Sequence, residues 1–109
     1  MKKNVIQDKS FQFAVRVVRC CQHLQSKNEY VLSKQFLRSG TSIGANAREA
    51  SQAASKKDFI YKMNIALKEA VETQYWIELL KETGYLKEEE ANNLHTNCTE
   101  LCKNIVHYQ

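Results

Sequence analysis

Apolar residues recur at alternating steps of four and three along most of this chain. This spacing places side chains on one face of an α-helix, so it predicts amphipathic helices that each bury one face. Three of these apolar stripes consist of Phe13, Val17, Cys20 and Leu24; of Phe59, Met63, Ala66, Ala70, Thr73, Ile77 and Leu80; and of Ala91, Leu94, Cys98, Leu101, Ile105 and Tyr108. The chain has no proline and only three glycines, so little interrupts the helices.

A fourth stripe is built from small residues and consists of Phe36, Gly40, Ile43, Ala47, Ala50 and Ala54. Glycine and alanine on a contact face let a neighbouring helix approach to the short end of the usual interaxial distance of about 8–10 Å. Each glycine inside a helix costs about 1 kcal/mol relative to alanine, so close packing has to offset that cost. We therefore expect this segment to be the central helix of a bundle.

Polar residues between the stripes mark the expected helix ends. The four helices are expected at about residues 10–26, 30–54, 57–83 and 87–109. Ser10 is expected to cap the first helix after a frayed segment 1–9, Ser55 and Asp58 form a capping box, and Gly84 ends the third helix. Short loops make consecutive helices antiparallel neighbours. The sequence thus predicts an all-α, antiparallel up-down-up-down four-helix bundle, with residues 1–109 as a single domain.

The third helix carries more apolar residues than one bundle core uses. Off its main stripe it has Ile60, Leu67, Val71, Tyr75, Trp76 and Leu79. Either this helix lies deepest in the bundle, or part of the wide apolar arc is an interface between copies of the chain. We favour the interface, because tryptophan and tyrosine are enriched at protein interfaces.

Charge is distributed unevenly along the chain. Residues 1–68 hold 13 Lys and Arg against 4 Asp and Glu, whereas residues 69–109 hold 3 against 8. A basic surface that meets phosphates, charge-complementary assembly of copies, and a solvated bundle whose halves neutralise each other all fit this asymmetry. The candidate phosphate-binding residues are Arg16, Arg19, Arg38, Arg48, Lys56 and Lys57. No base-reading module accompanies them, so we expect sequence-independent contacts.

The spacing of the potential metal ligands and the motifs of the chain favour structural roles over metal binding or catalysis. Four cysteines, Cys20, Cys21, Cys98 and Cys102, accompany His23 and His95, but their spacing is unlike that of zinc knuckles and most lie on or beside apolar stripes. We expect no metal and no cofactor. No phosphate loop, nucleophile elbow or di-iron motif is present, so we expect no enzymatic activity.

The polar face formed by Ser42, Asn46 and Glu49 is assigned to structure, where it would fix helix register or an interface. The uncharged run between Arg38 and Arg48 is too short to span a bilayer, and no apolar segment follows Lys3. We therefore expect a cytoplasmic protein without a membrane partner.

The segment from Leu37 to Ala50 carries a recognisable motif. Arg38, Ser42-Ile43, Asn46 and Glu49 follow the spacing Arg-x-x-x-Ser-Ile-x-x-Asn-x-x-Glu-Gly. Further matching stretches are Asp58-Phe59, Ala66 through Glu72, and Thr83-Gly84-Tyr85-Leu86. Over most of its length the chain resembles the bacterial four-helix-bundle proteins encoded in intervening sequences of large-subunit (23S) ribosomal RNA genes. It departs from that pattern at Gly44, where proline is frequent, at Ala50, which replaces glycine, and by lacking a proline before the second helix.

This resemblance implies a small cytoplasmic bacterial protein that forms a homo-oligomer, a ring of five, and has no known catalytic residues. Similar bundles include accessory proteins of diversity-generating retroelements, which form five-fold barrels and bind nucleic acid and a reverse transcriptase. We therefore expect a non-enzymatic, homo-oligomeric bundle that associates with RNA or DNA through basic surface. The alternative is a purely structural interaction module that assembles through complementary charge.

Overall fold

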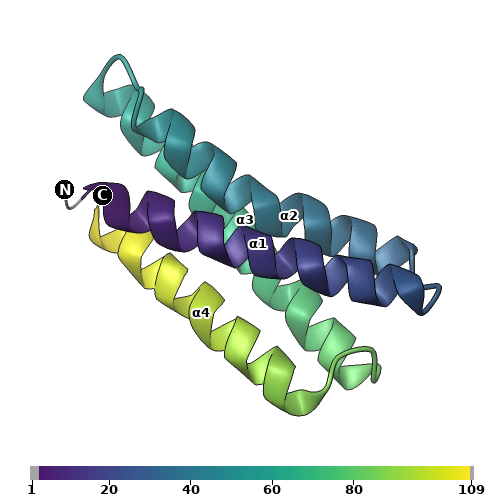
Figure 1. Ribbon diagram of the computed structural model, residues 1–109. Coiled ribbons are helices and arrows are strands. Elements are labelled where there is room, and N and C mark those ends of the chain that lie inside the picture. The colour runs from purple at the N-terminus through teal and green to yellow at the C-terminus, as the bar shows by residue number, and fades with distance from the viewer. Residues whose placement is uncertain (1–2, 109) are drawn as a thin grey trace.

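The computed structural model describes residues 3–108, which form four helices: α1 (Lys3–Ser26), α2 (Val31–Ala50), α3 (Lys56–Glu82) and α4 (Glu88–His107). Consecutive helices run antiparallel in a bundle that measures 44 × 21 × 20 Å (Figure 1). Each helix packs on two neighbours: α2 lies between α1 and α3, and α4 closes the bundle against α3 and, less extensively, α1. The predicted all-α, up-down-up-down four-helix bundle is confirmed.

The core consists of the four apolar stripes that the spacing predicts. Val17 and Leu24 of α1, Phe36 and Ile43 of α2, and Ile77 of α3 are among its most deeply buried side chains. Burying a residue of this size contributes about 1.5–3 kcal/mol to folding. The stripes therefore provide the main stabilisation of the bundle.

The glycines of α2 lie where α1 crosses it. A Cβ atom built on Gly40 would lie 2.8 Å from both γ-methyl groups of Val17, which is fully buried. One turn further on, a Cβ atom on Gly44 would lie 3.3 Å from the backbone oxygen of Ser10. The predicted close approach is confirmed at Gly40 of the small-residue stripe, and Gly44, which lies outside the predicted stripe, extends the contact.

The first helix begins well before Ser10, so the predicted frayed segment is wrong for residues 3–9; residues 1–2 lie outside the described part of the chain. The reason is that Ile6 continues the apolar stripe and is only 4% exposed. Ser10 is not a cap. Its side chain is fully buried and donates to the backbone oxygen of Gln7 at 3.2 Å. A small residue is needed at this position because the backbone of α1 passes so close to Gly44.

The second helix ends at Ala50, four residues before the predicted end, and Ala54 is exposed. Residues 51–54 turn the chain, and the extended Ser55 then starts α3, with its hydroxyl accepting from the amide of Asp58 at 3.1 Å. That capping bond confirms the predicted start of the third helix. Gly84, with φ of 84°, ends it as predicted, since a left-handed residue is needed there.

Glu29 caps α2 through a contact that the sequence analysis does not foresee. Its carboxylate accepts from the amide of Ser33 at 2.7 Å and from that of Leu32 at 3.0 Å. The preceding residue Asn28 has φ of 68°, and this left-handed conformation turns the chain back toward α1. The polar break between the first two helices is therefore an ordered corner.

Substitution of Gly40 tests the close crossing of α1 and α2. We expect Gly40→Ala to destabilise the bundle by about 1–2 kcal/mol, because crowding against Val17 outweighs the gain in helix propensity. Urea denaturation followed by circular dichroism measures the free energy of unfolding. Combined with Val17→Ala, which removes the two methyl groups, the glycine substitution should cost much less; additivity of the two changes within about 0.5 kcal/mol would contradict the contact.

Candidate nucleic-acid interface

The six predicted phosphate-binding residues do not form one patch. Arg38 turns from α2 toward α3, where its guanidinium lies 3.2 Å from the carboxylate of Glu69 and is also paired with Glu72. A phosphate would have to displace two carboxylates to reach it. The structure therefore places Arg38 in a helix-to-helix ion-pair network, and its exposed position makes each pair worth at most about 1 kcal/mol.

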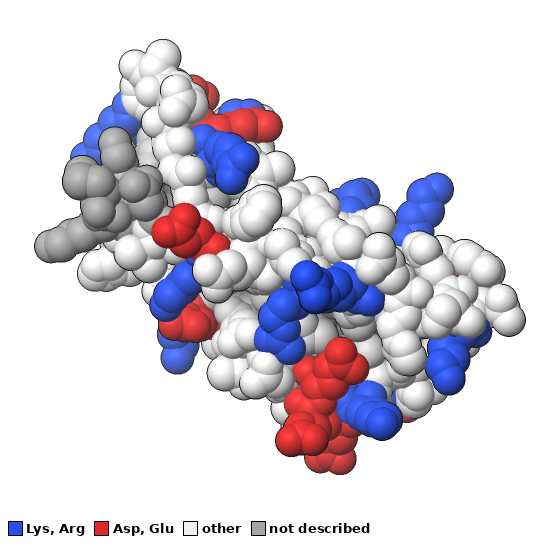
Figure 2. Space-filling view, in the orientation of Figure 1, with Lys and Arg blue, Asp and Glu red and all other residues white. Residues whose placement is uncertain are grey.

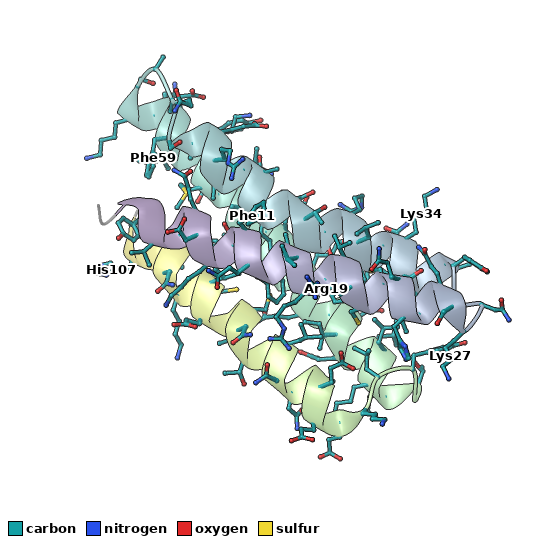
Figure 3. All side chains as sticks on the ribbon, viewed as in Figure 1. Phe11, Arg19, Lys27, Lys34, Phe59 and His107 are labelled. Atoms are coloured by element: carbon teal, nitrogen blue, oxygen red, sulfur yellow. The ribbon has the colours of Figure 1, made fainter. Side chains whose placement is uncertain are left out.

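Arg48 lies on the other side of α2, over the ring of Phe11 in α1. The centre of its guanidinium is 5.7 Å from the ring centroid, a cation–π geometry. Phe11 itself is 56% exposed (Figure 3). Both groups border a shallow hollow between α1 and α2 that Thr41, Gly44 and Ala45 also line.

The remaining four candidates lie in two places. Arg16 is partly buried in a groove between α1 and α4, while Arg19 is exposed on α1 (Figure 3). Figure 2 shows basic groups over the middle of the face where α1 lies, next to an acidic group. Lys56 and Lys57 are exposed in the first turn of α3. Among the described residues, no carboxylate lies within ion-pair distance of Arg19, Lys56 or Lys57.

The polar face of α2 is bonded within the chain. The Ser42 hydroxyl donates to the backbone oxygen of Arg38 at 2.6 Å, and the Asn46 amide donates to that of Ser42 at 2.8 Å. Glu49 reaches across to Lys62 of α3 at 2.8 Å, a hydrogen bond that raises the pKa of Lys62. Whether this face also contacts another molecule stays a prediction.

A buried hydroxyl pair that the sequence analysis did not single out joins α2 to α3. The hydroxyl groups of Thr73 and Ser39 are hydrogen-bonded to each other at 2.9 Å, and both side chains are fully buried. Thr73 also lies 2.7 Å from the backbone oxygen of Glu69. These bonds satisfy the polar groups inside the core, which would otherwise cost about 1–3 kcal/mol each.

Two helices keep an uncovered apolar stripe on their outer surface. On α3, Val71 and Tyr75 are 54% and 56% exposed, and Tyr61 lies on the same face. Leu67 and Trp76 are half-buried, so the wide apolar arc is used partly by the core and partly left outside. We name the exposed part, Tyr61, Val71 and Tyr75, the α3 stripe.

The second uncovered stripe lies on α1 and consists of Phe11, Ala14, Val15 and Val18, which line one shallow surface depression bordered by Arg19 and Gln22. We name it the α1 stripe. The sequence analysis missed it, although Phe11, Val15 and Val18 follow the same steps of four and three on the outer side of the helix. A helix with two apolar faces offers one to its own core and one to a neighbour.

The cysteines do not form a metal site. Within the described residues, no three His, Cys, Asp or Glu side chains converge where a metal ion would bind. Burial raises the pKa of Cys20 and of Cys21 to about 12. In α4 a hydrogen bond between the two thiols raises the pKa of buried Cys98 and lowers that of half-exposed Cys102. Cys102 is therefore the thiol most prone to ionise.

These features define a small antiparallel helical bundle with uncovered outer faces. No helix within residues 3–108 has the length and apolar character to cross a membrane. The chain belongs to the 23S rRNA-intervening sequence protein family, whose sequence model matches residues 2–107. The family resemblance noted from the motif in α2 is thereby confirmed.

A solved structure supports the same assignment. A crystal structure at 1.70 Å of a protein with unknown function, from the S23 ribosomal protein family of Bacteroides thetaiotaomicron, is 53% identical. The match covers 99% of this chain and 97% of that one, with a TM-score of 0.96. No curated protein matches this chain.

Thiol reactivity tests the electrostatics of α4. At pH 7–8 we expect iodoacetamide to alkylate Cys102 of the native protein first, because its lowered pKa leaves more thiolate at a given pH, whereas the other three thiols are buried and have raised pKa values. Mass spectrometry of the digested protein identifies the labelled cysteine. The variant Cys102→Ser should lose this rapid labelling; equal labelling of all four cysteines in the folded protein would contradict the assignment.

Proposed function

We propose that this chain is a non-enzymatic, cytoplasmic, homo-oligomeric helical bundle that associates with RNA or DNA through exposed basic residues. The observation that carries the proposal is the pair of uncovered stripes on α1 and α3. Exposed apolar patches that are rimmed by polar residues mark interaction sites in soluble proteins. Self-association covers both stripes at once without a second gene product.

In the proposed assembly the α1 stripe of one copy packs on the α3 stripe of the next. Since α1 and α3 occupy diagonal corners of the bundle, their outer faces point in different directions. A contact between two different surfaces is heterologous, and it closes into a ring when the rotation between copies allows it. The family resemblance implies five subunits in such a ring.

Nucleic-acid association rests on those candidate residues that have no partner carboxylate among the described residues, namely Arg16, Arg19, Arg48, Lys56 and Lys57. A few phosphate contacts per subunit give weak binding on their own. A ring repeats the same contacts around one assembly, so several weak contacts act together on one nucleic acid. Arg38 is left out of this set because Glu69 and Glu72 neutralise it.

A purely structural scaffold is the second candidate, and the pairing of Arg38 favours it. Where basic groups of the first half already pair with carboxylates of the second half, as Lys9 does with Glu100 and Arg38 with Glu69 and Glu72, less basic charge remains for phosphates. Salt separates the two candidates. Assembly through complementary charge predicts that the oligomer dissociates at high salt, whereas the nucleic-acid hypothesis predicts that only the ligand is lost.

Charge introduced into the α1 stripe tests self-association. We expect Val18→Glu to convert the oligomer to a monomer of 12.6 kDa, because burying an unpaired carboxylate in an apolar interface is costly. Light scattering coupled to size-exclusion chromatography measures the mass, and circular dichroism checks that the helices persist. The matched control is Val31→Glu, at an exposed valine outside both stripes, which should leave the mass unchanged. A monomeric parent protein at micromolar concentration would refute this part of the proposal.

Neutral substitutions at the start of α3 test the nucleic-acid hypothesis. We expect Lys56→Gln/Lys57→Gln to weaken binding of a short labelled RNA and to reduce the slope of log affinity against log salt by about 1–2, because each lost phosphate contact removes about 0.7–0.9. Fluorescence anisotropy over a salt series gives both quantities. The double variant Lys87→Gln/Lys103→Gln makes the same charge change in the acidic half and should have a smaller effect. Affinity that does not depend on salt would exclude electrostatic binding.

A further inference from the structure

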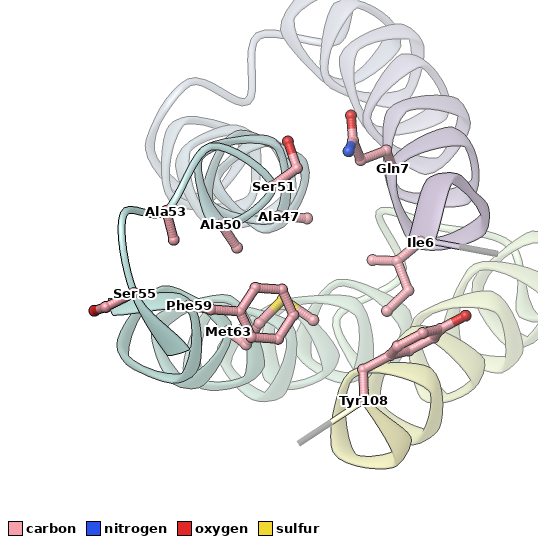
Figure 4. Close-up of a pocket in the computed structure, with 10 residues that line it drawn as sticks. All are labelled: Ile6, Gln7, Ala47, Ala50, Ser51, Ala53, Ser55, Phe59, Met63 and Tyr108. Atoms are coloured by element: carbon pink, nitrogen blue, oxygen red, sulfur yellow. The ribbon is translucent and has the colours of Figure 1, made fainter. Parts of the chain in front are cut away.

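A cavity opens at the end of the bundle where the α2–α3 hairpin reaches beyond α1 and α4 (Figure 1). Its volume is about 240 Å³, and its wall is formed by residues of α1, α2 and α3, the α2–α3 loop and Tyr108, which directly follows α4 (Figure 4). The floor is apolar and almost inaccessible to solvent, since Ile6, Ala47, Ala50 and Met63 are each at most 4% exposed. The space is thus continuous with the hydrophobic core.

The cavity exists because three alanines stand where larger side chains would close the core. Ala47 and Ala50 belong to the small-residue stripe of α2, and Ala53 follows in the loop to α3. Earlier in α2, at Gly40, the helix α1 covers the same stripe tightly and leaves no room for a side chain. Of the α1 side chains that the structure describes, Ile6 and Gln7 line this space without filling it, so small residues that give close packing elsewhere leave a hollow here.

Two aromatic rings and a thioether line the hollow. Phe59 and Met63 of α3 face the space from one side, and the ring of Tyr108 lies beside Ile6 on the other (Figure 4). Rings gain about 0.5–1.5 kcal/mol from edge-to-face or offset contacts beyond the area they bury, and sulfur makes favourable contacts with ring edges. The wall therefore favours a flat aromatic guest over an aliphatic one of equal size.

Four lining residues carry polar side-chain atoms: Ser55, whose hydroxyl accepts from the amide of Asp58, Tyr108, and two residues at the rim, Gln7 and Ser51. Gln7 provides an amide, and Ser51 provides a hydroxyl that already donates to the backbone oxygen of Arg48 at 2.6 Å and can still accept. Such a site can hold one polar N–H or O–H group of a guest while the rest of the guest stays in apolar surroundings.

From this geometry we propose that the end cavity is a binding site for a small aromatic molecule of one or two rings that carries a single hydrogen-bonding group. An apolar cavity of about 150 Å³ in another protein already binds benzene, so the larger volume here accommodates a substituted or fused ring. The site lies at the opposite end of α3 from Gly84 and uses none of the basic residues proposed to contact nucleic acid. It is independent of that function.

Indole is the probe for this site. We expect saturable binding of indole to the intact protein by isothermal titration calorimetry, with heteronuclear NMR shifts at the amides of Ala50, Ala53 and Phe59 and none at Gly84. Phenol should bind about two- to tenfold more tightly than cyclohexanol, which has the same size and hydroxyl but no aromatic ring. Equal binding of the two would overturn the aromatic assignment.

Filling the cavity provides the decisive variant. Ala50→Leu places three additional carbon atoms in the space and should weaken indole binding by about tenfold or more. Ala54→Leu makes the same change at an exposed alanine outside the cavity and should leave affinity within about twofold.

Thermal unfolding shows whether Ala50→Leu still folds, and if it does not, the smaller change Ala50→Val replaces it. The proposal is overturned if indole does not bind saturably, if its shifts do not centre on the cavity, or if the folded filled variant binds as well as the parent.

Discussion

The close crossing of α1 and α2 is the contact on which the rest of the bundle depends. Gly40 packs against the methyl groups of Val17, and Gly44 packs against the backbone of Ser10, so the two helices lie very close to each other. Because the chain is antiparallel throughout, the rotation of α2 against α1 also decides which residues α2 presents to α3. A buried hydrogen bond between Thr73 and Ser39 then joins α2 to α3. Close packing thus holds α1 against α2, and a buried hydrogen bond holds α2 against α3.

Much of this fold is readable from the sequence because helical spacing is a local property. Four sets of apolar residues at steps of four and three predict four helices. The predicted core positions of α3 from Met63 to Leu80 and of α4 from Ala91 to Ile105 are buried, whereas Phe59 and Tyr108 are only partly buried. The boundaries are harder to predict. Ser10 looks like a cap because serine often caps helices, but here tertiary packing outweighs that preference and requires a small residue next to Gly44. Ala54 fits the spacing of α2, yet the cap at Ser55 ends the helix first.

The candidate site was less predictable, since it depends on which side chains face one another across helices. Sequence identifies Arg38 as basic but does not show that Glu69 and Glu72 stand opposite it. The α1 stripe carries a readable signal in the spacing of Phe11, Val15 and Val18. The end cavity is only partly readable: the small residues Ala47 and Ala50 can be recognised in the sequence, but the unequal reach of the two helix pairs, which leaves the space beside them open, follows from no residue pattern.

Both ends of the described chain lie at the same end of the bundle. The first residue of α1, Lys3, and the last residue of α4, His107, lie near each other, while the α1–α2 and α3–α4 corners lie at the far end (Figure 1). A short peptide bridge between them would circularise the backbone without disturbing any helix, and new ends placed at either far corner would then give a permuted protein with the same bundle. Domains fused to the new termini would then extend from the far end of the bundle, opposite to the end at which Lys3 and His107 lie.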